Sequence, residues 1–135
     1  MTDPNRRINV TDAITRANEA LRGAETLIQS GLHRDAVSRA YYAAFHGLRA
    51  LLFARGLEAR THAGTLHLFN LEYLRPGLLP SSHNRLLAGL QRSREIADYD
   101  AAATFSGDDA RAALADAQTF VADAVAQLRK EGFAV

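Results

Sequence analysis

The stretch AVSRAYYAAFHGLRALLFARG, residues 36–56, decides the fold class, because its apolar residues recur with the period of an α-helix. It predicts a helix from about His33 to Arg55 that stops at Gly56, a residue suited to the left-handed conformation common at helix ends. One side of this helix forms an apolar seam of Val37, Tyr41, Ala44, Leu48 and Leu51. A seam with this spacing buries one face of a helix in a helical bundle.

Four further helical segments are predicted around this stretch. They run from about Thr11 to a stop at Gly31, from Thr61 to Leu74, from a cap at Ser81 or Ser82 to about Ala103, and from SGDD at 106–109 to a stop at Gly132. The segment RPGLLPSS separates the third helix from the fourth. In SGDD, Ser106 and Asp109 have the spacing of a capping box. We therefore expect one all-α domain over residues 1–135, with a core of about 10–131, folded as an antiparallel up-and-down bundle of four or five helices.

Composition narrows the functional classes. The chain has 47% hydrophobic residues and a net charge of +1, so it has no overall basic field that would demand nucleic acid. It has no cysteine, which excludes disulfides, thiolate metal sites and cysteine nucleophiles. The N-terminal residues lack the apolar core of a signal peptide, and no stretch reaches the roughly 18 apolar residues that span a bilayer. We expect a cytoplasmic protein without a membrane partner.

A second stripe on the helix of residues 33–55 is polar. It consists of Arg39, Tyr42, His46 and Arg49, which share one face roughly opposite the apolar seam. A solvated surface is one interpretation of this stripe. Because Phe45 and Phe53 flank it, the face mixes aromatic and cationic side chains, which is more typical of a surface that contacts a partner. We expect this face to meet another subunit or a ligand.

The segment RSREIADYD, residues 92–100, places a charge in an apolar position. Arg94 continues the seam of Leu87 and Leu90, and Asp98 follows four residues later, where an ion pair forms readily. Either Arg94 is a surface residue with a snorkelling stem, or it is sheltered in order to bind an anion such as phosphate. Tyr99 lies about 140° around the helix from Arg94, so one copy cannot aim both side chains at one point. Two copies meeting at a twofold axis could, which predicts a dimeric site.

The histidines do not predict a metal site. His62 lies at a predicted helix start, where the helix dipole favours the neutral imidazole, whereas His67 and His83 are expected at the surface. The sequence contains no HExxH motif and no set of His, Asp and Glu with the spacing of metal ligands. Glycine-rich phosphate loops are also absent. We therefore expect neither a metal nor another cofactor.

Three segments together resemble the HEPN family of small prokaryotic helical proteins: AVSRAYYAAFHGLRALLFARG at 36–56, RTHAGTLHLFN at 60–70 and LQRSREIADYD at 90–100. The resemblance covers roughly residues 10–130 and is closest to an uncharacterised branch with an arginine–aspartate–tyrosine helix. It implies a helical bundle that dimerises. Many relatives are toxins paired with a minimal nucleotidyltransferase as antitoxin. Active relatives are metal-independent ribonucleases in which an arginine, followed after four to six residues by a histidine, lines the dimer cleft.

The resemblance maps Arg94 onto the family arginine, where it would contact phosphate, while Tyr99 stands in place of the histidine. It implies a homodimeric toxin-like protein that binds RNA or a nucleotide, with metal-independent endoribonuclease activity as one outcome. A non-catalytic module that binds a nucleotide or docks a nucleotidyltransferase is the alternative, and a structural scaffold is a third. The candidate catalytic residues are Arg94, Asp98 and Tyr99, and the candidate binding residues are Arg39, Tyr42, His46 and His62. His46 and His62 are also the candidates for supplying the missing imidazole.

Overall fold

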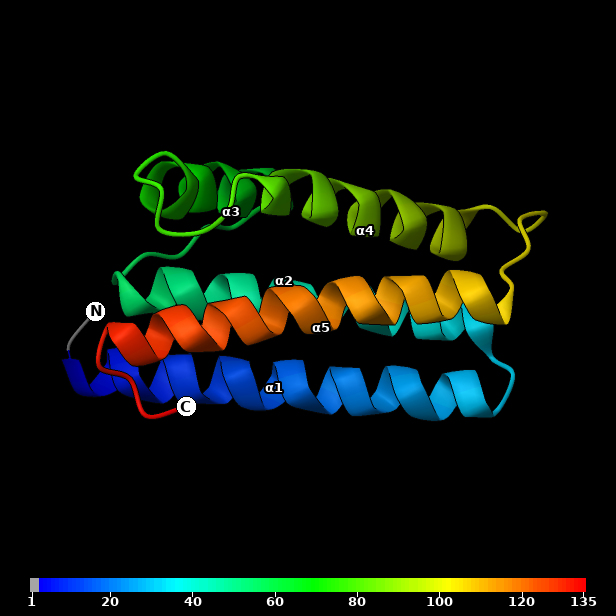
Figure 1. The fold of residues 1–135 in the computed structure, drawn as a ribbon, viewed down its shortest axis with the longest axis horizontal. Coiled ribbons are helices and arrows are strands. Elements are labelled where there is room, and N and C mark those ends of the chain that lie inside the picture. Colours follow the sequence, from blue (N-terminus) through cyan, green and yellow to red (C-terminus); the bar gives the residue numbers. More distant parts are fainter. Residues whose placement is uncertain (1–2) are drawn as a thin grey trace.

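The computed structural model describes residues 3–135 as an antiparallel helical bundle (Figure 1). Its elements are α1 (Asp3–Gln29), α2 (His33–Ala54), α3 (His62–Phe69), the π-helical turn η1 (Asn70–Leu74), α4 (Ser82–Tyr99) and α5 (Gly107–Lys130). The helices α1, α2 and α5 lie side by side, and α3 and α4 form a further layer (Figure 1). Residues 3–135 contain no β-strand. The predicted all-α bundle is confirmed.

Two helix boundaries differ from the prediction. The helix α1 begins at Asp3, eight residues before Thr11, because Pro4 is tolerated in the first turn of a helix and Asp3 complements its positive end. The helix α4 ends at Tyr99 instead of Ala103, and the chain then turns toward α5. Within the described part of the chain, no helix is both long and apolar enough to cross a membrane.

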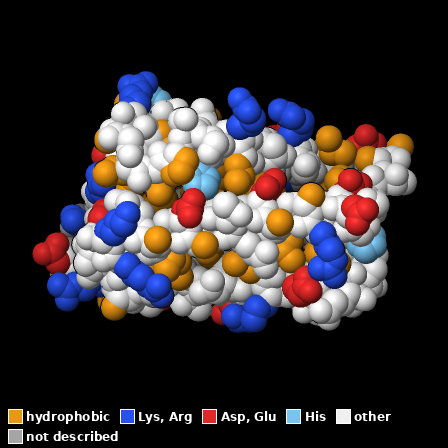
Figure 2. Space-filling view, in the orientation of Figure 1, with side chains coloured by type: hydrophobic (Ala, Val, Ile, Leu, Met, Phe, Trp, Pro, Cys, Tyr) orange, Lys and Arg blue, Asp and Glu red, His pale blue; other side chains and the backbone are white. Residues whose placement is uncertain are grey.

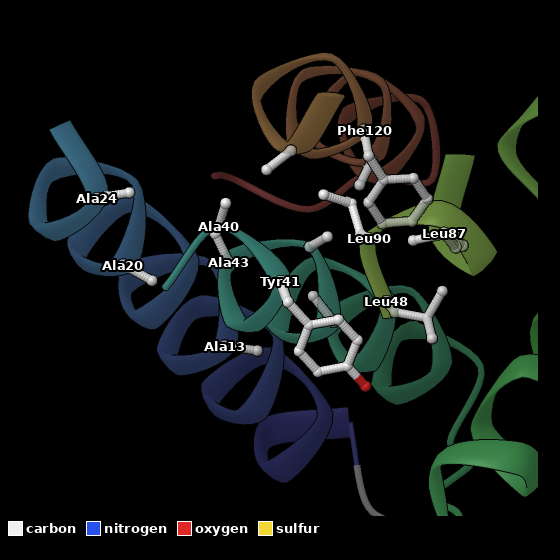
Figure 3. Close-up of a cluster of buried hydrophobic side chains, with 14 of the residues drawn as sticks. Ala13, Ala20, Ala24, Ala40, Tyr41, Ala43, Leu48, Leu87, Leu90 and Phe120 are labelled. Atoms are coloured by element: carbon white, nitrogen blue, oxygen red, sulfur yellow. The ribbon is translucent and has the colours of Figure 1, made fainter. Parts of the chain in front are cut away.

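The helix α2 is the central element, since it contacts α1, α3, α4 and α5. It meets α1 through small side chains, and Figure 3 shows Ala13 and Ala20 of α1 beside Ala40 and Ala43 of α2. All four alanines are buried. Side chains this small let the two helix backbones approach closely. At the end of α2, Gly56 has a φ of +70°, as predicted from its place after the helix.

The other side of α2 buries its apolar seam. Tyr41, Leu48 and Leu51 belong to the same hydrophobic cluster as Leu90 of α4 and Phe120 of α5 (Figure 3). Burial of one such leucine side chain contributes about 2 kcal/mol to folding. The seam predicted from the sequence is thus the core of the domain.

His83 is part of this core, so its predicted surface position is wrong. His83 lies in the first turn of α4, and the residue is only 3% exposed. Its side chain faces α5. Its Nε2 lies 2.7 Å from Oδ2 of Asp123, and its ring meets the ring of Phe120 edge to face. A polar ring is tolerated here because a carboxylate from another helix pairs with Nε2, a partner that the local sequence does not show, while Nδ1 stays buried without a partner among residues 3–135.

The capping box predicted for α5 is confirmed. The Ser106 side chain accepts a hydrogen bond from the backbone N–H of Asp109 at 3.0 Å. The Asp109 carboxylate accepts one from the backbone N–H of Ser106 at 2.9 Å. These two bonds fix where α5 starts after the turn that follows α4.

Arg34, in the first turn of α2, holds the end of α4. Its Nη1 donates to the carbonyl oxygens of Ala97 at 2.6 Å and Asp100 at 2.9 Å, and its Nη2 donates to that of Ala103. The last carbonyls of a helix have no intrahelical partner, and a guanidinium fork can satisfy several of them at once. Arg34 therefore ties the segment that follows Tyr99 to α2.

We expect Arg34→Ala to lower the free energy of unfolding by about 2–3 kcal/mol, because three carbonyls lose a charged donor. Urea denaturation followed by circular dichroism measures the change. Arg111→Ala is the matched control, since its ion pair with Glu25 is exposed and its loss costs under about 1 kcal/mol. Equal effects of the two substitutions would contradict the role given to Arg34.

Candidate functional site

Arg94 lies against two tyrosine rings of α2. Its guanidinium carbon is 4.8 Å from the ring centre of Tyr41 and 5.9 Å from that of Tyr42. The Arg94 side chain is only 11% exposed, although it sits near the surface of the bundle. A cation over an aromatic face is attracted by the ring quadrupole, and its planar group stacks well there. Of the two interpretations of Arg94 in the sequence, the structure supports the sheltered one.

Asp98 is the carboxylate partner of Arg94. Its Oδ2 accepts a hydrogen bond from Nη1 of Arg94 at 3.1 Å, and its Oδ1 accepts one from the Ser38 hydroxyl of α2 at 2.5 Å. Burial opposes the charge of Arg94, but the hydrogen bond to Asp98 and the nearby tyrosines outweigh it and raise the pKa of Arg94. The guanidinium therefore stays charged, and Asp98 fixes it relative to α2.

One edge of the guanidinium is not satisfied. Nε of Arg94 is buried and has no hydrogen-bond partner among residues 3–135. Asp98 is the sole carboxylate that forms an ion pair with Arg94 in this part of the chain. Asp98 occupies Nη1 alone, so Nη2, which makes no hydrogen bond within residues 3–135 and is not enclosed as Nε is, keeps capacity for an additional anion.

His62 joins the cluster through the hydroxyl of Tyr41. Its Nδ1 lies 2.8 Å from the Tyr41 oxygen, and its ring packs on Phe45 with the ring centres 4.5 Å apart. The side chain of Thr61 caps α3 by accepting a hydrogen bond from the backbone N–H of Gly64, which places His62 as the first residue of the helix. His62 and Arg94 thus lie against the same tyrosine, one at its hydroxyl and one on its face.

Burial sets the protonation states of this pair. It raises the pKa of Tyr41 to about 12, with Arg94 acting against the rise. Burial, assisted by the positive charge of Arg94, lowers the pKa of His62. A lowered pKa agrees with the neutral imidazole expected from the sequence. The cause differs from the expected one: burial and the charge of Arg94 lower the pKa, whereas the sequence had suggested the helix dipole.

The remaining predicted binding residues lie along the exposed side of α2. Tyr42 is half-buried between two arginines, with the guanidinium carbon of Arg39 at 5.4 Å and that of Arg94 at 5.9 Å from its ring centre. His46 lies one helical turn further on and is half-buried. Burial lowers the pKa of His46, and the charges of Arg49, Arg16 and Arg39 lower it further. This side of α2 is therefore locally basic although the chain is nearly neutral.

Tyr99 lies apart from this cluster. It is the last residue of α4 and is 79% exposed, the highest exposure among the large hydrophobic side chains of the described residues. One copy thus brings together Arg94, Asp98, Tyr42, His62 and Arg39, while Tyr99 points to solvent. This agrees with the helical geometry, which gave Arg94 and Tyr99 different directions.

Two residues of this cluster, Tyr41 and Ser38, were not predicted from the sequence as site residues. Tyr41 was assigned to the apolar seam, and it is indeed 6% exposed, but both its ring face and its hydroxyl serve polar groups. A buried tyrosine hydroxyl requires a hydrogen-bond partner, and that requirement was the available signal. Ser38 carried no signal, because its partner Asp98 is 60 residues away in the sequence.

The face that carries α5 has a mixed surface. On the face that carries α5, basic and acidic side chains alternate with small hydrophobic patches (Figure 2). Residues 3–135 contain no group of three or more His, Asp and Glu side chains that could hold a metal ion. The Arg94 cluster, in which a sheltered cation lies against Tyr41 and Tyr42, is the candidate site.

Comparison with known proteins relates this chain to one protein family. The sequence model of the HEPN domain matches residues 10–128. A Methanocaldococcus jannaschii protein named as a candidate toxin is 34% identical over 115 residues, which cover 85% of this chain and 84% of that protein. A Gloeobacter violaceus protein of the family named UPF0332 is 35% identical over 111 residues, 82% of this chain and 88% of that protein. A second M. jannaschii candidate toxin is 29% identical over 108 residues, 80% of this chain and 74% of that protein.

Both His46 and His62 have a lowered pKa, so acid should destabilise the fold through them. The unfolded chain takes up these protons at the ordinary pKa of 6.5, before the folded chain does. The two neutral histidines contribute fully to the free energy of unfolding above pH 6.5. This contribution is lost as the pH falls through the lower pKa that each histidine has in the folded chain. We expect the double variant His46→Gln, His62→Gln to lose less unfolding free energy than wild type over this range. His67→Gln, a substitution of an exposed histidine outside the cluster, is the control. An unchanged slope in the double variant would refute the assignment.

Proposed function

Because this chain belongs to the HEPN domain family, we propose that it is the toxin-like member of a toxin–antitoxin pair. In this proposal two copies form a homodimer that binds RNA or a nucleotide through the Arg94 cluster. The family assignment and the names of the two M. jannaschii relatives support the toxin-like role. The RNA ligand, the dimer and the partner are the parts that experiment has to test.

The observation that carries the proposal is the sheltered guanidinium of Arg94. An arginine placed only for solubility would extend into water, whereas this one is 11% exposed and stacked on tyrosine. In a site from which water is partly excluded, a fixed cation stabilises phosphate charge more strongly than it does in open water. Arg94 would contact a phosphate group, and Asp98 would hold it in the orientation that allows this.

The neighbouring side chains suit a nucleic-acid ligand. Tyr42 is half-buried between Arg39 and Arg94, so its ring lies at the edge of a cationic surface. Single-stranded nucleic acids are commonly bound by a basic surface interleaved with aromatic rings. Tyr99, exposed at the end of α4, would complete the site from the second copy of the dimer.

A specific observation favours the alternative, a non-catalytic binding or docking module. Tyr99 stands where the resemblance implies a histidine, and tyrosine is as a residue type a poor general base at neutral pH, because a phenol gives up its proton only in alkaline solution. In this version Arg94 and Asp98 bind a nucleotide or support contact with a minimal nucleotidyltransferase. Cleavage of RNA by the purified protein separates the two versions, since only the first predicts it.

The first test of the proposal is the loss of an arginine. Arg94→Ala should weaken binding of a short single-stranded RNA by about tenfold and reduce the salt dependence by about one released counterion, because a phosphate contact is lost. Fluorescence anisotropy across a series of salt concentrations measures both quantities. A gel assay on total RNA, made with the same two proteins, reports cleavage.

Arg92→Ala is the control for this test, because Arg92 is an exposed arginine two residues away on the same helix. It should bind as wild type does. In cells, growth arrest on induction should be lost with Arg94→Ala and kept with Arg92→Ala. An Arg94→Ala protein that is folded, dimeric and unchanged in RNA binding would contradict the proposal.

The second test is assembly. The mixed aromatic and cationic side of α2 and the exposed Tyr99 lead us to expect a dimer at micromolar concentration. Light scattering coupled to size-exclusion chromatography measures the mass of the particle. A mass of one chain, 14.7 kDa, would rule out a site shared by two copies.

The proposed partner can be examined separately. A toxin of this kind would be encoded beside a minimal nucleotidyltransferase that neutralises it. Co-expression with the product of the adjacent gene should then restore growth, and the two proteins should copurify. Failure of every neighbouring gene product to restore growth would remove the toxin–antitoxin part of the proposal.

A further inference from the structure

We infer that His62 is a neutral hydrogen-bond donor to the same phosphate group that Arg94 binds, and that Tyr41 is the positioning residue that makes it one. This inference rests on the proposed function in that it places the phosphate at Arg94, and it specifies how the site meets that phosphate. In this inference the phosphate is held by two donors, the charged guanidinium of Arg94 and the uncharged Nε2–H group of His62. It also gives Tyr41, a core residue, a role in the site.

The first step is the position of the two groups on one side chain. The guanidinium carbon of Arg94 lies 4.8 Å from the Tyr41 ring centre, and Nδ1 of His62 lies 2.8 Å from the Tyr41 oxygen. Figure 3 shows Tyr41 packed in the core with its hydroxyl oxygen directed away from the alanines of α1. The tyrosine therefore fixes a cation from α4 and an imidazole from α3 relative to each other.

The second step is the direction of the hydrogen bond. The hydroxyl of Tyr41 keeps its proton at neutral pH, since its pKa is raised to about 12. Nδ1 of His62 is the acceptor within reach of that proton, and the Tyr41 hydroxyl makes no other hydrogen bond among residues 3–135. The hydroxyl therefore donates to Nδ1, and a neutral imidazole that accepts at Nδ1 must carry its own proton on Nε2.

The third step is what this tautomer can do. With a proton on Nε2, His62 donates a hydrogen bond and cannot accept a proton at that atom. The positive charge of Arg94 also disfavours a second positive charge on His62. His62 is therefore suited to hold a phosphate oxygen and not to remove a proton from a ribose hydroxyl. A neutral donor next to one arginine binds an anion without bringing two cations together.

The test is the tautomer of His62, measured by nitrogen-15 NMR of the histidine-labelled protein at neutral pH. We expect wild type to show the Nε2–H tautomer at His62. Tyr41→Phe keeps the ring under Arg94 and removes only the hydroxyl, so it should yield a mixture of the two tautomers. An Nδ1–H tautomer in wild type, or an unchanged tautomer in Tyr41→Phe, would overturn the inference.

Inorganic phosphate is the probe for the donor role. On titration with phosphate, the His62 Nε2 resonance should shift in wild type and should not shift in Arg94→Ala, while the exposed ring of His67 stays unchanged in both. A wild-type His62 that does not respond to phosphate would overturn the shared site. These measurements need no RNA, so they stand even if wild type fails to bind RNA and the proposed function falls.

A pair of substitutions then separates a donor from a base. Glutamine carries an amide N–H near the position of Nε2, so His62→Gln should keep RNA affinity within about threefold, whereas His62→Ala should lose about tenfold. Equal losses in both variants would overturn the donor role. If the protein cleaves RNA and His62→Gln binds RNA but no longer cleaves, His62 takes up a proton and the inference is wrong.

Discussion

The stacking of Arg94 on Tyr41 is the interaction on which the site depends. Tyr41 is buried in the seam that holds α2 to the rest of the bundle, so its position is fixed by core packing. Its outer face carries Arg94 of α4, and its hydroxyl holds His62 of α3. A rigid core residue can place two mobile polar groups at a defined separation, because packed interiors allow little displacement. The packing of the core around Tyr41 therefore determines the geometry of the candidate site.

Asp98 and Arg34 extend this arrangement to the end of α4. Asp98 bridges Arg94 and Ser38, so it links α4 to α2 beside the tyrosines. Arg34 satisfies the carbonyls at the end of the same helix. Together they fix the last two turns of α4, including the position from which Tyr99 extends into solvent. A helix end held this firmly can present an exposed tyrosine to a partner without losing its own structure.

The sequence was sufficient where structure is determined locally. The apolar period predicted α2 and its seam, Gly56 predicted its end, and the spacing of Ser106 and Asp109 predicted the start of α5. It failed where the partner is distant in the chain. His83 is buried because Asp123 and Phe120 of another helix accommodate it.

The candidate site was predictable to a similar degree. The charge of Arg94 in an apolar position pointed to it, and Asp98 followed from helical spacing. The role of Tyr41 could not be read from its helix, since its partners come from α3 and α4. The direction of Tyr99 followed from helix geometry, but whether a second copy meets it depends on a contact between chains.

The central claim is that Arg94 serves ligand binding and that the fold does not require it. Removing one partner of a fully buried ion pair costs about 3–5 kcal/mol, because the other charge is left unpaired, but the Asp98 side chain is 30% exposed and keeps its hydrogen bond from Ser38. The most direct measurement is the free energy of unfolding of Arg94→Met, in which the methionine can cover the same tyrosine rings. The account predicts a value within about 1 kcal/mol of wild type, together with weakened RNA binding. A loss of about 3 kcal/mol or more would show that the guanidinium is architectural and would contradict the account.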